Sequence, residues 1–275
     1  VNVAATAHEL TARHREALAR VRLLLSAGAP VSRSVLRAAR AIMPNAAAHT
    51  PYGMTEVLPV TDITPEELER AGAGNGVCVG RPLPDVEVAI SPIDVLGTAS
   101  AMTTTTPGVV GEICIRAAHV KDSYDKLWVT QRASEASPQW HRSGDVGHLD
   151  DESRLWVEGR MIHVVATADG PVTPVGIEQA VEALDSVDQA AVVGVGPKGT
   201  QQVVVVVVPR ARPRRPELLH GQLAHDVRAV AAVDVAAVFA VPALPVDKRH
   251  NSKIDRIRVG AWADALLAGG RMRAL

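Results

Sequence analysis

Residues 52 to 56 ("YGMTE") bring an aromatic ring, a glycine, a hydroxyl and a carboxylate together between two apolar stretches. These groups suit a nucleotide bound with magnesium. The face of Tyr52 can stack on adenine, the hydroxyl of Thr55 and nearby turn amides can bind a phosphate, and the carboxylate of Glu56 can hold Mg²⁺. A polar turn between two strands explains the same residues equally well. Support for nucleotide chemistry therefore has to come from other parts of the chain.

Three further polar clusters follow: "HRSGDVGHLD" at 141–150, "EGR" at 158–160 and "PVDKRHNSKIDR" at 245–256. Asp145 comes directly after Gly144, and an aspartate in that setting can accept hydrogen bonds from both ribose hydroxyls. Arg160 and Lys253 can neutralise the charge that builds at phosphorus during phosphoryl or nucleotidyl transfer. Together with residues 52–56, these clusters would complete a site for a magnesium nucleotide.

The order of the clusters resembles that of the AMP-forming adenylating superfamily, which includes acyl-CoA synthetases, luciferases and peptide-synthetase adenylation domains. "YGMTE" is similar to the Y-G-x-T-E motif of that superfamily, and "SGD" at 143–145 to its ribose-binding aspartate motif. "GR" at 159–160 resembles the arginine at its interdomain hinge, Lys253 the lysine of its last motif, and "SAGAP" at 26–30 the turn that lines its adenine pocket. The resemblance covers nearly the whole chain, but only the second half of such an enzyme.

This resemblance implies ATP and Mg²⁺ as cofactors. Lys253 would bridge carboxylate and phosphate oxygens during adenylation, Glu56 would hold Mg²⁺, and Asp145 would hold the ribose. The catalytic residues would be Lys253, Thr55, Arg160 and His163. The nucleotide contacts would come from Gly28, Ala29, Pro30, Tyr52, Gly53, Thr55, Asp145, Arg160 and Lys253.

Two departures from the common pattern narrow the choice within the superfamily. His163 stands where most relatives have the hinge aspartate, and the last motif has Asn-Ser rather than Gly before Lys253. Both departures resemble the β-lactone synthetases of bacterial olefin biosynthesis. Such an enzyme would activate a 2-alkyl-3-hydroxy fatty acid as its acyl-adenylate, and the 3-hydroxyl would then displace AMP to close a β-lactone. His163 could serve as a base toward that hydroxyl or simply form a hydrogen bond at the hinge.

Two other hypotheses stay open. A fatty acyl-CoA ligase would share the first half-reaction, with a thiol attacking the adenylate in the second. A non-catalytic docking module is the alternative of another class, because the phosphate loop of the superfamily, which ends in lysine, is expected upstream of residue 1. For the same reason we expect weak or no adenylation by the 275 residues without the missing upstream half of the enzyme. The resemblance to the β-lactone synthetases of olefin biosynthesis also implies the thiolase, the reductase and the β-lactone decarboxylase of that pathway as partners.

Composition limits the other classes of function. With 29 basic and 30 acidic side chains the formal charge is −1, so we expect no nucleic acid as a partner. Purely apolar runs such as Val203 to Val208 are far too short to span a membrane, so we expect no transmembrane segment. The two cysteines, Cys78 and Cys114, lie far apart without metal-type spacing, which favours a reducing cytoplasm.

The elements that must position these residues fall into two parts. Residues 21–50 show a strand, a helix and a second strand, which is typical of a parallel α/β layer, and we expect the strand in "VRLLLSAGAP" to be buried. From Gly76 onward, short runs of β-type residues with Gly and Pro between them predict an antiparallel β unit. Farther along the chain, "PKGT" at 197–200 lies between two apolar runs and predicts a hairpin, and the six valines at 203–208 predict a buried or paired strand. The fold class is thus α/β and α+β. We expect the C-terminal portion of a large adenylating domain at 1–160 and a small mobile lid domain at 161–275.

Overall fold

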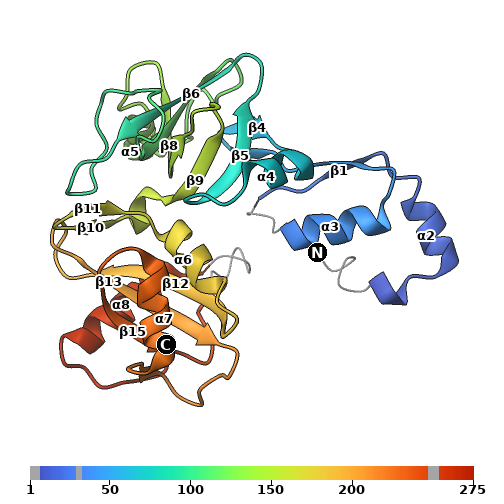
Figure 1. Cartoon of the computed structure of the whole chain (residues 1–275). Coiled ribbons are helices and arrows are strands. Elements are labelled where there is room, and N and C mark those ends of the chain that lie inside the picture. The colour runs from blue at the N-terminus through green and yellow to red at the C-terminus, as the bar shows by residue number, and fades with distance from the viewer. Residues whose placement is uncertain (1–6, 29–32, 247–253) are drawn as a thin grey trace.

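The computed structural model of the chain describes residues 7–28, 33–246 and 254–275. Three regions can be followed in Figure 1: an N-terminal segment with helices and two short strands, a large antiparallel sheet, and a C-terminal module of helices and strands. Among the described residues, no helix combines the length and the apolar character needed to cross a membrane.

The N-terminal segment contains the predicted strand–helix–strand unit. The elements are η1 (Ala7–Glu9), α2 (Ala12–Leu18), β1 (Leu23–Leu25), α3 (Arg33–Ile42) and β2 (Ala47–His49). Strands β1 and β2 pair in parallel, which confirms the predicted parallel α/β layer. The predicted burial of the first strand is wrong, because Leu23 and Leu25 are 55% and 60% exposed. The opposite face of the β1–β2 pair carries Ala48, which is buried by other described residues.

The large sheet has seven strands in the order β3-β4-β5-β9-β8-β7-β6, and every pairing within it is antiparallel. This arrangement confirms the predicted antiparallel unit. The strands are β3 (Tyr52–Met54), β4 (Val57–Asp62), β5 (Val77–Pro82), β6 (Val86–Pro92), β7 (Gly111–Ala117), β8 (His141–Leu149) and β9 (Leu155–Arg160). The core of the sheet includes Val60, Ile90, Ile113, Ile115 and Leu155.

Two short helices accompany this sheet, α4 (Pro65–Ala71) and α5 (Trp128–Ser134). The start of α4 follows from its sequence, because Thr64 and Glu67 form a capping box around Pro65 in the first turn. The Thr64 N–H donates to the Glu67 carboxylate at 2.9 Å, and the Glu67 N–H donates to Thr64 Oγ1 at 3.3 Å. This helix packs beside α3 and so connects the N-terminal segment with the sheet.

The C-terminal module is built on a four-stranded sheet in the order β12-β13-β15-β14. Its elements are η2 (Met161–His163), β10 (Val165–Thr167), β11 (Gly170–Val172), α6 (Pro174–Glu182), β12 (Val187–Val195), β13 (Gln202–Pro209), β14 (Glu217–Leu218), α7 (Gln222–Ala231), β15 (Val235–Ala240) and α8 (Arg256–Leu267). Strands β12 and β13 form the hairpin predicted around "PKGT" at 197–200.

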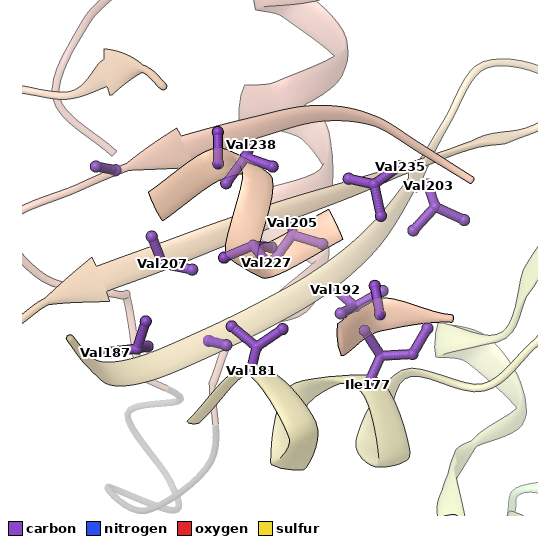
Figure 2. Close-up of a cluster of buried hydrophobic side chains, with 14 of the residues drawn as sticks. Ile177, Val181, Val187, Val192, Val203, Val205, Val207, Val227, Val235 and Val238 are labelled. Atoms are coloured by element: carbon purple, nitrogen blue, oxygen red, sulfur yellow. The ribbon is translucent and has the colours of Figure 1, made fainter. Parts of the chain in front are cut away.

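The six valines of β13 show why this module holds together. Val203, Val205 and Val207 face a core shared with α6 and α7, as Figure 2 shows, whereas Val204, Val206 and Val208 face a second core shared with α8. Successive side chains of a strand point to opposite faces, so an unbroken valine run suits a strand that is covered on both sides. The predicted burial of this strand is confirmed.

Candidate functional site

The β3–β4 hairpin contains the "YGMTE" stretch at residues 52–56. Thr55 and Glu56 form the turn between Met54 and Val57, which pair across the hairpin. Gly53 is required by packing, because a Cβ atom at this position would lie 2.7 Å from both the Val57 carbonyl oxygen and Leu58 Cδ1. The turn therefore holds one hydroxyl and one carboxylate at the tip of a closely packed hairpin.

Tyr52 and Arg160 converge on Asp145 from two different strands. Tyr52 Oη donates to Asp145 Oδ2 at 2.8 Å, and Arg160 Nε lies 3.1 Å from Asp145 Oδ1. Asp145 on β8 and Arg160 on β9 are direct partners in the antiparallel register. Burial, followed by the charge of Asp145, raises the pKa of Tyr52 well above its ordinary value. Tyr52 thus stays a neutral donor, and it leaves its ring beside the carboxylate proposed to bind ribose.

The backbone before Asp145 is held by a second carboxylate. Gly144 has a φ of +74°, which favours glycine, and its N–H donates to Glu112 Oε1 at 2.9 Å. Arg142 Nε donates to Glu112 Oε2 at 2.7 Å, so the buried Glu112 is neutralised by a neighbour on the same strand as Asp145. The Asp145 N–H donates to Ser143 Oγ at 3.0 Å. These contacts fix the loop-like start of β8 and the direction of the Asp145 side chain.

Glu56 has a partner that sequence reasoning missed. Tyr124 Oη donates to Glu56 Oε1 at 2.8 Å, and burial together with this hydrogen bond raises the pKa of Tyr124 to about 12. The ammonium of Lys121 lies 4.1 Å from the centre of the Tyr124 ring, and the Lys121 N–H donates to the Glu56 carbonyl at 2.7 Å. One signal was available in the sequence, since the chain has only two tyrosines and the other lies in "YGMTE".

The donor set suits magnesium bound together with a nucleotide. Among the described residues, no group of three His, Cys, Asp or Glu side chains is arranged to hold a metal ion. Mg²⁺ in nucleotide sites commonly takes one or two carboxylates, with phosphates and water supplying the remaining ligands. Glu56, a partly exposed carboxylate beside the Thr55 hydroxyl, fits that role.

The end of β9 contains a second cluster that the sequence did not indicate. Glu158, in "EGR", is fully buried, and it accepts hydrogen bonds from His148 Nδ1 at 2.5 Å and from Thr173 Oγ1 at 2.6 Å. Asn75 Nδ2 donates to the same carboxylate. Glu158 therefore joins the large sheet to the start of α6 in the C-terminal module.

His163 is partly buried and is affected by the charges of two arginines. Burial, followed by the charges of Arg256 and Arg160, lowers the pKa of His163 to about 4. Arg256 is itself held by Glu178, with Nε donating to Glu178 Oε1 at 2.8 Å. The same carboxylate also accepts from the Val192 N–H at 2.9 Å. His163 is accordingly a neutral imidazole at neutral pH.

The other predicted site residues are distributed as follows. Gly28, with a φ of +91°, follows β1 at the end of the first described range, whereas Ala29, Pro30 and Lys253 lie outside the described residues. Arg160 is 55% exposed at its side chain and so is accessible to a ligand. The structure thus brings Tyr52, Asp145 and Arg160 together, and it places Thr55 and Glu56 in the adjoining hairpin turn.

The sequence of the chain is similar to that of known proteins. Residues 2–124 match the family described as AMP-binding enzyme. The chain is 36% identical to an olefin beta-lactone synthetase of Stenotrophomonas maltophilia over 272 residues, which are 93% of this chain and 49% of that protein.

Two solved structures have the same fold. The amide bond synthetase McbA from Marinactinospora thermotolerans aligns with a TM-score of 0.68 at 27% identity, over 88% of this chain and 46% of that one. The O-succinylbenzoate coenzyme A synthetase of Bacillus subtilis, in complex with ATP and magnesium ion, aligns with a TM-score of 0.69 at 23% identity, over 94% of this chain and 49% of that one.

The fold is therefore that of the adenylate-forming enzymes. The resemblance to the AMP-forming adenylating superfamily, and within it to the olefin β-lactone synthetases, is confirmed by these matches. The chain spans about half the length of the relatives it matches, which is consistent with a C-terminal portion.

Proposed function

We propose that this chain is the C-terminal part of a β-lactone synthetase. The complete enzyme would convert a 2-alkyl-3-hydroxy fatty acid and ATP into a β-lactone, AMP and pyrophosphate. The observation that carries the proposal is the 36% identity to an olefin beta-lactone synthetase across 93% of the chain. The thiolase, reductase and β-lactone decarboxylase of an olefin pathway would be its functional partners.

The nucleotide would lie across the large sheet at the Tyr52–Asp145–Arg160 cluster. Tyr52 would place its ring against adenine while its hydroxyl steadies Asp145, and Asp145 would accept the ribose hydroxyls. Arg160, exposed at the end of β9, would contact ribose or phosphate. Residues 28–30 would complete the adenine pocket, and Gly28 lies three residues after the end of β1.

The first half-reaction would take place at the hairpin turn. When bound, Mg²⁺ would offset the charge of the phosphates, and Glu56 is the residue that would hold it. Thr55 would donate to the α-phosphate, and Lys253 would bridge the substrate carboxylate and the phosphate in the transition state. Because the acyl carbon and the 3-hydroxyl belong to one molecule, the second half-reaction needs orientation more than a second substrate site.

The decisive experiment uses the protein with its encoded upstream sequence, MgATP and a 2-alkyl-3-hydroxyalkanoic acid, without CoA. AMP release would be followed by chromatography and the lactone carbonyl by NMR. We expect lactone and AMP in equal amounts, with both products lost in Lys253→Ala and retained in the control Lys198→Ala. AMP release that requires CoA and yields a thioester would instead establish an acyl-CoA ligase. Absence of turnover under both conditions would support a docking module.

A further inference from the structure

A histidine–aspartate pair lies beside the nucleotide residues but has no part in the roles assigned so far. His49 ends β2 and Asp62 ends β4, and His49 Nδ1 lies 2.5 Å from Asp62 Oδ2. The side chains are 30% and 26% exposed, so neither is sealed inside the core. Asp62 Oδ1 is buried and has no hydrogen-bond partner among the described residues. The charge of this carboxylate is therefore directed mainly at the imidazole.

This contact determines the chemistry of the ring. An ionised carboxylate only accepts hydrogen bonds, so Nδ1 of His49 must carry the proton that it shares with Asp62. In the neutral imidazole, Nε2 then carries the lone pair and can accept a proton. The carboxylate also stabilises the imidazolium that forms when Nε2 is protonated, as the aspartate of a catalytic triad does.

His49 lies at the carboxyl end of a pair of parallel strands. His49 is the last residue of β2 and is level with Leu25, the last residue of its parallel neighbour β1. The Ser26 N–H donates to the His49 carbonyl at 3.0 Å, so His49 adjoins the turn that leads to Gly28. Ligands of parallel α/β layers bind beyond the carboxyl ends of the strands. Tyr52 follows three residues later and pairs with Thr61, the neighbour of Asp62, across the β3–β4 hairpin, so both members of the pair adjoin a nucleotide residue along the chain or across the hairpin.

We propose that His49, oriented by Asp62, is the base that accepts the proton of the substrate's 3-hydroxyl in the ring-closing step. The inference rests on the proposed lactone synthetase function. The O–H bond breaks as Nε2–H forms, and the hydroxyl oxygen bonds to the acyl carbon. The bond from that carbon to the AMP phosphate oxygen breaks, and AMP leaves with the electron pair. The imidazolium then returns its proton to solvent. Asp62 is a positioning residue, since it acts through His49.

The other histidine considered for this step is placed less favourably. Burial and the positive charges of Arg256 and Arg160 oppose the formation of an imidazolium at His163. His49 faces a carboxylate instead, so its protonated form gains a favourable partner. The two histidines thus have opposite electrostatic surroundings, and the surroundings of His49 suit a proton acceptor.

The test separates the two half-reactions in the protein with its upstream sequence. Acid-dependent exchange of pyrophosphate into ATP reports adenylation, and lactone formation reports both steps. For His49→Ala and His49→Gln we expect exchange within about threefold of the unchanged protein, while lactone formation falls about 10²- to 10⁴-fold, the range of general base catalysis. Acyl-adenylate should accumulate in quenched reactions, and added imidazole should restore part of the lactone formed by His49→Ala.

Further variants complete the design. Asp62→Asn should lower lactone formation at least about tenfold with exchange preserved, because the amide no longer imposes one tautomer. His225→Ala, at an exposed position on α7, is the matched control and should leave both half-reactions unchanged. Unchanged lactone formation in both His49 variants, or an equal fall in exchange and lactone formation, would overturn the assignment of His49. Absence of lactone from the unchanged protein would instead overturn the proposed function.

Discussion

Tyr124 Oη donates a hydrogen bond to Glu56 Oε1 at 2.8 Å, across 68 positions of sequence. The other tyrosine of the chain, Tyr52, donates in the same way to Asp145 Oδ2 at 2.8 Å. Both tyrosines have raised pKa values, so both remain neutral donors at physiological pH. Each carboxylate that we propose for nucleotide or metal binding is therefore held by a phenol from a distant part of the chain.

Tyr124→Phe tests whether this contact positions Glu56 for magnesium. Without the hydroxyl, the Glu56 side chain is free to rotate, and loss of a residue that orients a metal ligand typically costs about 10- to 100-fold in metal affinity or activity. We expect the Mg²⁺ concentration for half-maximal pyrophosphate exchange to rise about tenfold, measured by titration at fixed ATP. An unchanged Mg²⁺ dependence would contradict the role of Glu56 or that of its partner.

Asp145→Asn tests the proposed ribose contact. The substitution keeps the shape of the side chain but removes the charge that pairs with Arg160 at 3.1 Å and that would accept from ribose. Hydrogen bonds to charged groups contribute about 1.5–3 kcal/mol, so ATP should bind about 10- to 100-fold more weakly by calorimetry. As a control, Asp151→Asn, at an exposed turn after β8, should not alter binding.

Glu158→Ala should destabilise the fold more than an exposed glutamate change does. The buried carboxylate accepts from His148 and Thr173, and its removal leaves these donors without their partner. We expect the free energy of unfolding to fall by about 2–4 kcal/mol in urea titrations. Glu152→Ala removes a surface ion pair with Arg81 and should cost less than about 1 kcal/mol. Equal effects of the two substitutions would show that the Glu158 cluster contributes little.

His163 should make the stability of the fold depend on pH between the pKa of its imidazole in the folded chain and that in the unfolded chain. In the unfolded chain the imidazole has an ordinary pKa of 6.5, whereas the folded chain lowers the pKa to about 4. Between these values the unfolded state binds more protons, so stability is fully present above about pH 6.5 and declines as the pH falls toward 4. His163→Gln should flatten this part of the curve of melting temperature against pH, whereas His225→Gln should not. NMR titration of the unchanged protein checks the pKa of His163 directly.

The sequence by itself determined features that depend on neighbouring residues. The valine run of β13 predicted a buried strand because successive side chains of a strand alternate between two faces, and here both faces are covered. The strand–helix–strand unit, the antiparallel sheet and the hairpin at residues 197–200 followed from residue types and turns. The order of the motifs was sufficient to indicate the resemblance to the adenylating superfamily, which the matches confirm.

Only the tertiary structure decided which of these residues meet. The contacts of Glu56 with Tyr124, of Glu158 with Asn75, and of His49 with Asp62 join separate segments whose spacing follows no local period. The exposure of Leu23 and Leu25 could likewise not be predicted from the sequence, because an apolar strand has the same residue pattern whether or not another element covers it. Local patterns depend on the backbone and its nearest neighbours, whereas these contacts and coverings depend on how whole sheets and helices pack.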